Sequence, residues 1–310
     1  MSTKLEIGQR CSEATRELEL DSGGTGLRAD FFLAVDMPLP WPKPVFNHQL
    51  FSGVSELLES YSSSIRLLAS VPENNDHLTV TTYQRKQTEH PDKSFLHRSQ
   101  IIFQPRDLLE VLKEILDGKK VEEVREEKAR ELWVCTQGSH DVCCGSEGTA
   151  LSLEANKNLP DVKVRRVSHL GGHRFAPTAV TFPDGRMWSH LSMENLYKIF
   201  DETPIEENLL KKCRGWSGSE TGPEQIAERE GLNLYGWNWD RYERKTTVIS
   251  EEESKIKVLV TGFAPEHQTE TRFEVVIEES GKTPAFSCDK AGDIPTKWQT
   301  QYEVKTVDVQ

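Results

Sequence analysis

Hydrophobic positions in the first 118 residues alternate between strand-like runs and helical spacing. Apolar residues from Leu50 to Tyr61 recur every three or four positions, which predicts an amphipathic helix. A second helix is predicted to open at Pro105 and to end at Gly118. Short runs rich in apolar and β-branched residues predict four strands, at 31–35, 65–69, 78–83 and 95–103. The predicted order of elements is βαβ followed by ββα.

The same order recurs about 100 residues downstream. A helix is predicted to begin near Cys144, and another closes the segment around 196–200. Pro183-Asp184-Gly185 is a favourable turn between two of the strands. The strands of this half are predicted at 132–134, 162–167, 178–182 and 187–190. Between the halves, residues 118–130 are charged nearly throughout and predict a solvated helix or linker.

This repeat of element order predicts an α/β protein with two thioredoxin-like units in tandem. The first unit has Val35 and Asp36 at the turn where the second has a cysteine, so it is expected to be a scaffold. Further along, TGPEQIAERE predicts a short helix, and residues 245–310 alternate as antiparallel strands do, forming a C-terminal β annex. The predicted division is a scaffold unit at 1–125, a ferredoxin-like unit at 126–205 and a helix and β-strand annex at 206–310.

Composition limits the partners and the compartment. The net charge of −12 over 310 residues argues against nucleic acid or an anionic membrane as the main partner. No run approaches the ~20 apolar residues of a membrane span, and the N-terminus lacks the apolar core of a signal peptide. We therefore expect a cytoplasmic protein, in which the six cysteines are metal ligands or buried thiols rather than disulfides.

Two cysteines and two histidines lie close together in the second half. Cys135 and Cys144 are nine positions apart, and His169 and His173 are four apart. Two sulfur and two imidazole donors suit zinc or an iron–sulfur cluster. A zinc knuckle usually places its cysteines about 2–4 residues apart, which is closer than here. Neighbouring Cys143 is expected to be a packed thiol, because adjacent side chains point in different directions.

Three nearby side chains are candidates to orient or compensate these ligands: Asp141, Ser168 and Arg174. The glycines at 171 and 172 make a regular helix between the histidines unfavourable, so a tight loop is expected there. No Cys-x-x-Cys pair occurs, which disfavours thiol–disulfide chemistry. No glycine-rich dinucleotide fingerprint is present either.

Several segments resemble the motifs of the sucrase/ferredoxin-like family, with HLGGHRFA the most specific. They are CTQGSHDVCCG, SHLGGHRFAPT, FPDGRMW, RCSEATRE, MPLPWPKP and CRGWSGSETGPEQIAE. The resemblance implies a thioredoxin-like ferredoxin fold with a 2Fe-2S cluster held by two cysteines and two histidines. Carried onto this chain, it selects Cys135 and Cys144 rather than Cys143, together with His169 and His173.

The expected function is therefore that of a soluble electron-transfer protein, a redox carrier rather than a catalyst, with a donor and an acceptor that the sequence does not name. Two thiolates and two neutral imidazoles leave an oxidised 2Fe-2S centre uncharged, whereas four thiolates leave it at −2, so this ligand set favours a higher potential. Two alternatives remain: a structural zinc protein acting as an interaction module, and a thioredoxin-fold thiol–disulfide oxidoreductase.

Overall fold

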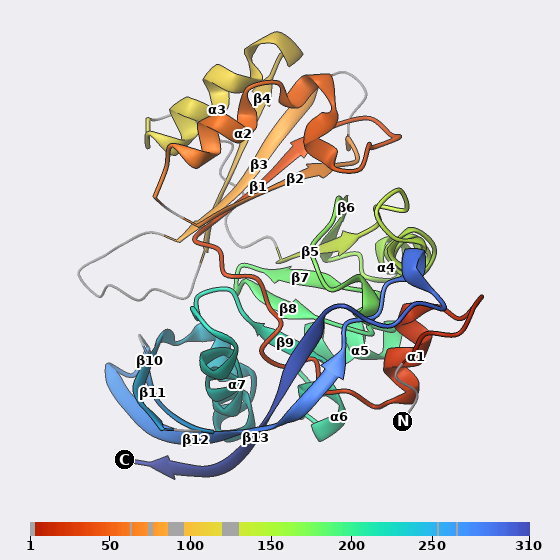
Figure 1. Cartoon of the computed structure of the whole chain (residues 1–310). Helices are drawn as coiled ribbons and strands as arrows, with labels where there is room; N and C mark the ends of the chain where they lie inside the picture. Colours follow the sequence, from red (N-terminus) through yellow and green to blue (C-terminus); the bar gives the residue numbers. More distant parts are fainter. Residues whose placement is uncertain are drawn as a thin grey trace.

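The computed structural model of the chain describes residues 4–62, 64–73, 77–85, 96–119, 130–252, 254–264 and 266–310. These residues form a mixed α/β structure with one nine-stranded sheet and a separate four-stranded antiparallel sheet (Figure 1). Residue 95 and most of the charged segment predicted as a helix or linker at 118–130 lie outside the described residues.

The first half has the predicted order of elements. It comprises β1 (Phe31–Asp36), η1 (Val45–Asn47), η2 (Gln49–Phe51), α2 (Val54–Glu59), β2 (Ile65–Ser70), β3 (Leu78–Arg85), β4 (Leu96–Phe103), η3 (Pro105–Asp107) and α3 (Leu108–Leu116). Strand β1 pairs in parallel with β2 and antiparallel with β3, which pairs with β4. The helix predicted from Leu50 is shorter, because Gly53 adopts a left-handed φ of 77° and separates η2 from α2.

The second half has the same order. It comprises β5 (Arg130–Cys135), a π-helical turn η4 (Cys144–Gly148), α4 (Thr149–Asn158), β6 (Val162–Val167), η5 (His173–Phe175), β7 (Ala179–Phe182), β8 (Arg186–Trp188) and α5 (Met193–Phe200). Strand β5 lies parallel to β6 and antiparallel to β7. Strand β8 pairs antiparallel with β7 on one side and with β9 (Cys213–Trp216) on the other. The repeat of topology predicted from the element order is therefore present, while its thioredoxin-like character stays a prediction.

The two halves form one sheet through an antiparallel contact between β2 and β6, where Ser70 is opposite Val167. The strand order is β4-β3-β1-β2-β6-β5-β7-β8-β9. Backbone hydrogen bonds extend this junction, since Ser168 N donates to Ala69 O at 2.8 Å and Val71 N donates to Arg166 O at 3.0 Å. The segment that follows β6, which carries both predicted histidine ligands, is thereby fixed against the first half.

The N-terminal helix α1 (Cys11–Glu17) packs on the second half, although it belongs to the predicted 1–125 unit. Arg16 forms an ion pair with Glu147 at 2.8 Å and donates a hydrogen bond to the carbonyl of Ala176 at 3.0 Å. The division into three units stays a prediction. Helix α1, at the start of the predicted 1–125 unit, contacts the half of the molecule that carries the predicted metal ligands.

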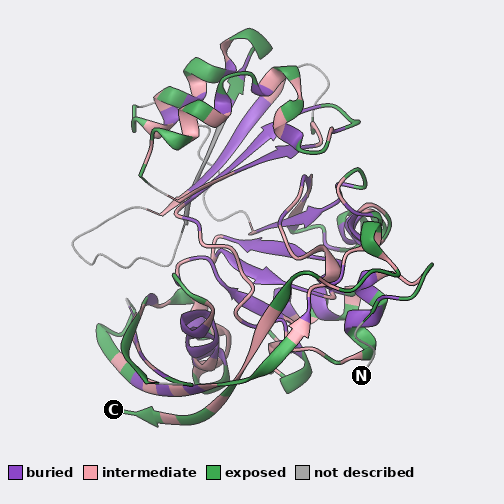
Figure 2. Ribbon diagram, viewed as in Figure 1, coloured by how far each residue is buried: buried purple, intermediate pink, exposed green. Residues whose placement is uncertain are grey.

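The predicted C-terminal β annex is present as a four-stranded sheet. It comprises β10 (Glu243–Glu252), β11 (Lys255–Ala264), β12 (Thr269–Pro284) and β13 (Trp298–Val309). The sheet curves around α7 (Gly222–Tyr235), most of which is buried (Figure 2). Helix α7 begins as its sequence predicts, because Thr221 and Glu224 form a capping box and Pro223 occupies its first turn. The short helix α6 (Glu207–Leu210) precedes β9.

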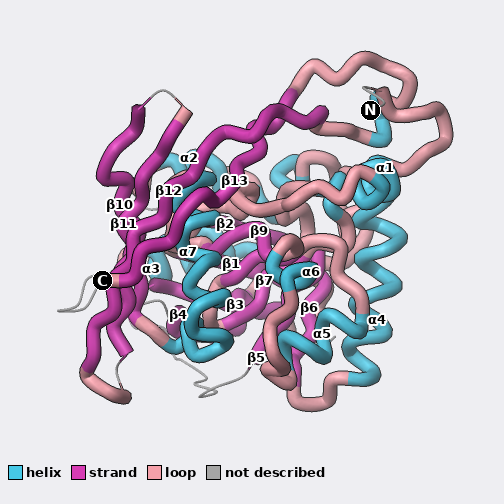
Figure 3. Tube along the Cα trace, turned by 90° about the horizontal axis from the view of Figure 1, so that it is seen from below, coloured by secondary structure: helices cyan, strands magenta, loops and turns pink. Residues whose placement is uncertain are grey.

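The connection between β12 and β13 reaches back to the N-terminal helix (Figure 3). It contains the short turn η7 (Cys288–Lys290), and Gly292 N donates to Leu5 O at 2.8 Å. Phe286 of this connection is buried in the same hydrophobic cluster as Cys11 and Cys144. The N-terminal helix α1 and the connection between β12 and β13 thus lie over the predicted metal site. Among the described helices, none has the length and apolar character needed to cross a bilayer.

Candidate metal centre

Cys135 and Cys144 come together where strand β5 meets the turn η4. A Cβ on Gly148 would lie 2.0 Å from the carbonyl oxygen of Cys135, so only glycine lets η4 approach the end of β5 so closely. Gly145 and Gly138 also pack closely, since a Cβ on Gly145 would lie 2.5 Å from the Cα of Gly138. Close backbone packing across this loop therefore brings the two thiols into contact.

Both thiols are fully buried, and the interaction between them shifts their pKa values in opposite directions. The hydrogen bond from Cys144 lowers the pKa of Cys135 well below its usual range; burial opposes this shift, and His169 and the N–H of Leu170 add to it. The same hydrogen bond, together with burial, raises the pKa of Cys144. One sulfur of the pair thus favours the thiolate form that a metal requires.

Two arginines, the buried Arg214 and the partly buried Arg66, interact electrostatically with these thiols, and the sequence did not single out either of them. Burial lowers the pKa of Arg214 to about 10, while the charges of Cys135 and Cys144 act in the opposite direction. Arg66 also interacts electrostatically with Cys135. The guanidinium of Arg214 donates to the carbonyl of Gly171 at 3.1 Å, so it also fixes the loop between the histidines. Arg214 and Arg66 therefore place positive charge next to the two thiols.

His169 lies beside the thiol pair and contributes a free ring nitrogen. Its ring stacks on that of His140, with centroids 3.5 Å apart, and its backbone N–H donates to Gln137 at 3.1 Å. Its carbonyl accepts a hydrogen bond from Arg66 at 3.0 Å. The Nδ1 atom of His169 is buried and has no hydrogen-bond partner among the described residues. A buried polar atom without a partner is costly, which fits a donor held ready for a metal.

His173 is partly exposed, with 20% of its side chain accessible. Its ring centroid is 6.1 Å from that of His169, and its Nδ1 lies 3.0 Å from Oδ2 of Asp141. The loop predicted between the histidines is present, since both intervening glycines have left-handed φ values, at 77° for Gly171 and 67° for Gly172. His173 borders a cavity of about 250 Å³.

The three other predicted side chains take different positions. Asp141 contacts His173, and its carboxylate also accepts from the backbone N–H of Cys143 at 2.8 Å. Ser168 instead accepts a hydrogen bond from the N–H of Ala69 at 3.0 Å, which belongs to the junction between the two halves. The guanidinium of Arg174 lies over the ring of Phe175, 4.3 Å from its centroid.

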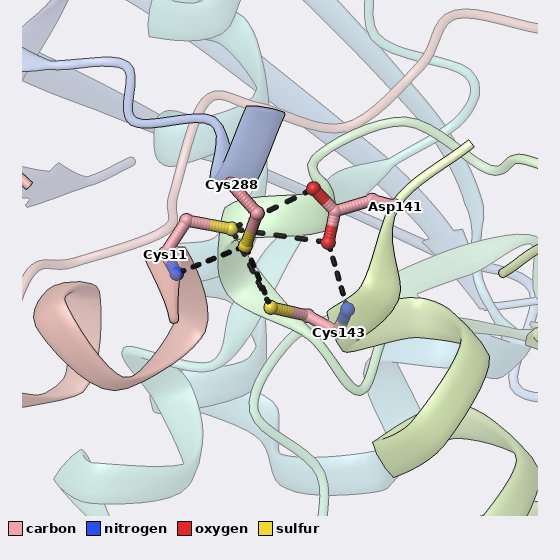
Figure 4. A group of neighbouring side chains, drawn as sticks. All are labelled: Cys11, Asp141, Cys143 and Cys288. Carbon is pink, nitrogen blue, oxygen red and sulfur yellow. Dashed lines mark hydrogen bonds between the residues drawn. The ribbon is translucent and has the colours of Figure 1, made fainter. Parts of the chain in front are cut away.

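A second group of donors lies beside the first (Figure 4). One ligand atom from each of Cys11, Asp141, Cys143 and Cys288 lies within 4.8 Å of all the others, and this group could hold a metal ion. The sequence predicts Cys143 to be a packed thiol. No local motif predicts this group, because Cys11 and Cys288 come from opposite ends of the chain and meet only in the folded protein.

Three comparisons with known proteins were informative to different degrees. The chain is 32% identical to altered inheritance of mitochondria protein 32 of the yeast Debaryomyces hansenii over an alignment of 106 residues, which covers 31% of this chain and 39% of the yeast protein. No solved structure matches the chain. The family model for sucrase/ferredoxin-like proteins matches residues 24–215, which include all four predicted ligands and well over half of the sequence. The chain therefore belongs to the sucrase/ferredoxin-like family.

Proposed function

We propose that this chain is an electron-transfer protein that binds a 2Fe-2S cluster through Cys135, Cys144, His169 and His173. The observation that carries the proposal is the convergence of two buried thiols with an imidazole whose buried Nδ1 has no partner. The two imidazole rings lie 6.1 Å apart, which is close enough for both to bind one centre. The donor set of two sulfurs and two ring nitrogens fits an iron–sulfur centre.

The chain's own residues would prepare these ligands. Asp141 accepts the hydrogen bond of His173 at Nδ1, so the Nε2 atom of that ring is left as the metal donor. A carboxylate in this position fixes the tautomer and makes the imidazole a better ligand. The interaction with Cys144 lowers the pKa of Cys135, which favours the thiolate form that a metal binds.

Buried positive charge supports the redox role. A 2Fe-2S cluster, when bound, accepts and releases one electron. Arg214 and Arg66 lie close enough to the thiols to stabilise negative charge there, and burial strengthens that interaction. Together with the neutral imidazole ligands, they favour a potential above that of a four-cysteine ferredoxin, for which about −400 mV is typical.

Electrons are proposed to enter and leave on the histidine side. Both cysteine ligands are fully buried, whereas His173 is partly exposed and borders the cavity of about 250 Å³. Arg174, Lys290 and Lys297 line the same cavity alongside Asp289 and Asp293, so its rim offers charged side chains of both signs to a redox partner. The donor and the acceptor would therefore approach across η5 and the connection between β12 and β13.

The thioredoxin-like subtype is part of the same proposal. In each half, a parallel β–α–β pair is followed by an antiparallel hairpin and a helix. The second half carries the proposed ligands, and the first would act as its scaffold through the β2–β6 junction.

Anaerobic purification followed by iron and sulfide analysis tests the proposal. We expect about two irons per chain and an electron paramagnetic resonance signal after reduction. Cys135→Ser should remove both, whereas Cys213→Ser, which changes a buried cysteine of β9 outside both donor groups, should keep both. A colourless wild-type protein with zinc as its only metal would reject the proposal in favour of a zinc-binding interaction module.

The thiol–disulfide alternative has its own test. Cys143 and Cys144 are fully buried, so neither presents an accessible thiol to a protein substrate. Thiol reductase activity that survives in a His169→Ala/His173→Ala variant would support that alternative and contradict an iron–sulfur role.

A further inference from the structure

We propose that Cys11, Cys143, Cys288 and Asp141 form a second metal site, which binds a single zinc-class divalent ion and is distinct from the proposed cluster ligands. The four residues come from α1, the loop before η4 and the turn η7 (Figure 4). None of the three cysteines belongs to the donor set of two cysteines and two histidines described above.

The distances fit a tetrahedral site. Zn–S bonds of about 2.3 Å and Zn–O bonds of about 2.0 Å separate donor atoms by about 3.5–3.8 Å at the corners of a tetrahedron. The Sγ atom of Cys143 lies 3.6 Å from that of Cys11 and 3.3 Å from that of Cys288. The carboxylate oxygens of Asp141 lie 3.9 and 4.0 Å from Sγ of Cys11. Small side-chain adjustments would bring all four donors to equal distances from one ion.

The donor chemistry selects the class of ion. Three sulfur donors favour a soft or borderline metal and exclude magnesium and calcium, which take oxygen ligands. A carboxylate as the fourth donor is a common ligand of zinc and a poor one of monovalent copper. Cys11, Cys143 and Asp141 are almost wholly buried, so the thiolates that would form on metal binding, together with the carboxylate, would require a cation at close range. A divalent ion at the centre of the group meets that requirement.

Binding at this site would connect three distant parts of the chain. The ion would join the N-terminal helix α1 and the connection between β12 and β13 to the loop that carries Cys144. The backbone N–H of Cys11 already donates to Sγ of Cys288 at 3.3 Å, so α1 and η7 are in contact without the ion. Asp141 contacts both the proposed zinc ligands and His173. The second site would thus hold α1 and the β12–β13 connection in place beside the proposed cluster.

A cobalt titration tests this inference independently of the proposed cluster. In the reduced Cys135→Ser/Cys144→Ser protein, which retains no sulfur ligand of the first site, we expect one Co²⁺ per chain with sulfur-to-cobalt charge-transfer bands and tetrahedral ligand-field bands. Adding Cys288→Ser, on a partly exposed turn, should abolish binding, whereas adding Cys213→Ser should leave it intact. Absence of cobalt binding in the Cys135→Ser/Cys144→Ser protein, or binding that Cys288→Ser leaves unchanged, overturns the inference.

Alkylation of the wild-type protein gives a second readout if the multiple variants do not fold. With Zn²⁺ bound, Cys11, Cys143 and Cys288 should be protected together, and a chelator should expose all three together. A disulfide between Cys143 and Cys288 in the protein as purified under reducing conditions, or alkylation that is the same with and without Zn²⁺, contradicts a zinc site. An absence of iron from the wild-type protein would reject the proposed cluster but would leave both of these zinc readouts unaffected.

Discussion

The Nδ1 atom of His173 lies 3.0 Å from Oδ2 of Asp141. Burial by itself would raise the pKa of Asp141, but the hydrogen bond and charge of His173 and the N–H of Cys143 lower it below its usual range. The carboxylate is therefore ionised at neutral pH and fixes the orientation of the imidazole. This contact joins the loop that follows β5 to the turn η5, and it links the two donor groups of the protein.

Asp141→Asn should weaken retention of the proposed cluster. The amide keeps the size of the side chain but loses the charge that holds Nδ1 of His173, and loss of such a partner typically costs about 10–100-fold in metal affinity. Iron transfer to a chelator, followed at neutral pH, measures the effect. Asp289→Asn is the control, because that exposed carboxylate contacts neither histidine. Equal iron release from the Asp141→Asn protein and the wild type would show that the contact does not support the ligand.

His169→Cys should retain a cluster but lower its midpoint potential. The substitution replaces a neutral ligand by a thiolate, so both redox states gain a negative charge and the reduced state is disfavoured. Redox titration followed by electron paramagnetic resonance measures the potential of variant and wild type. A potential that does not change would contradict the charge argument.

Gly148→Ala should destabilise the fold at the proposed site. The added Cβ would lie 2.0 Å from the carbonyl oxygen of Cys135. Relieving this clash requires the backbone of η4 or of β5 to move. Overpacking of this kind costs about 1–3 kcal/mol or more. Chemical unfolding measures the loss, with Glu154→Ala on the exposed face of α4 as the control. Equal stability of the Gly148→Ala protein and the wild type would mean that η4 can move away from β5.

Glu228→Ala should destabilise the protein strongly without touching the proposed ligands. Glu228 is fully buried on α7 and binds Arg186 at 2.9 and 3.0 Å and Arg244 at 2.6 Å. Its removal leaves buried guanidinium charge without a full complement of acceptors, which typically costs about 3–5 kcal/mol. Asn233→Ala, on the exposed side of the same helix, should have little effect. Similar unfolding midpoints for the two variants would contradict this account.

His190 should make the protein less stable in mild acid. Burial lowers the pKa of His190 to about 4, and its Nδ1 lies 3.1 Å from the carbonyl of Ala176. The unfolded chain, with a histidine pKa of about 6.5, binds a proton that the folded chain does not bind until pH falls to about 4. Stability should therefore decrease as pH falls through this window, by up to about 3 kcal/mol from this group.

His190→Asn isolates that contribution. His190 has a left-handed φ of 46°, which asparagine tolerates well. The variant should lose stability less steeply than the wild type between pH 6.5 and 4.5, whatever its stability at neutral pH. Parallel slopes for the two proteins would show that His190 titrates normally in the folded state.

Much of the local structure followed from the order of residues along the chain. The periods of apolar residues predicted the strands of both halves, the helices around them and the C-terminal antiparallel sheet, because each depends on neighbours within a few positions. The glycine pair between His169 and His173 likewise predicted the left-handed loop that is present. The helix after Leu50 was predicted too long, since a turn of 3-10 helix and Gly53 interrupt the apolar spacing.

The longer-range arrangement did not follow from local patterns. Spacing and family motifs pointed to Cys135, Cys144, His169 and His173, all within 39 positions of one another along the sequence. The approach of Arg214 to the thiols, the stacking of His140 on His169, and the meeting of Cys11 with Cys288 depend on how strands and termini pack. Such contacts join residues far apart in the chain, and no short pattern encodes them; folding creates them when the sheet aligns its strands and when α1 and the β12–β13 connection meet over the loop that carries Cys143.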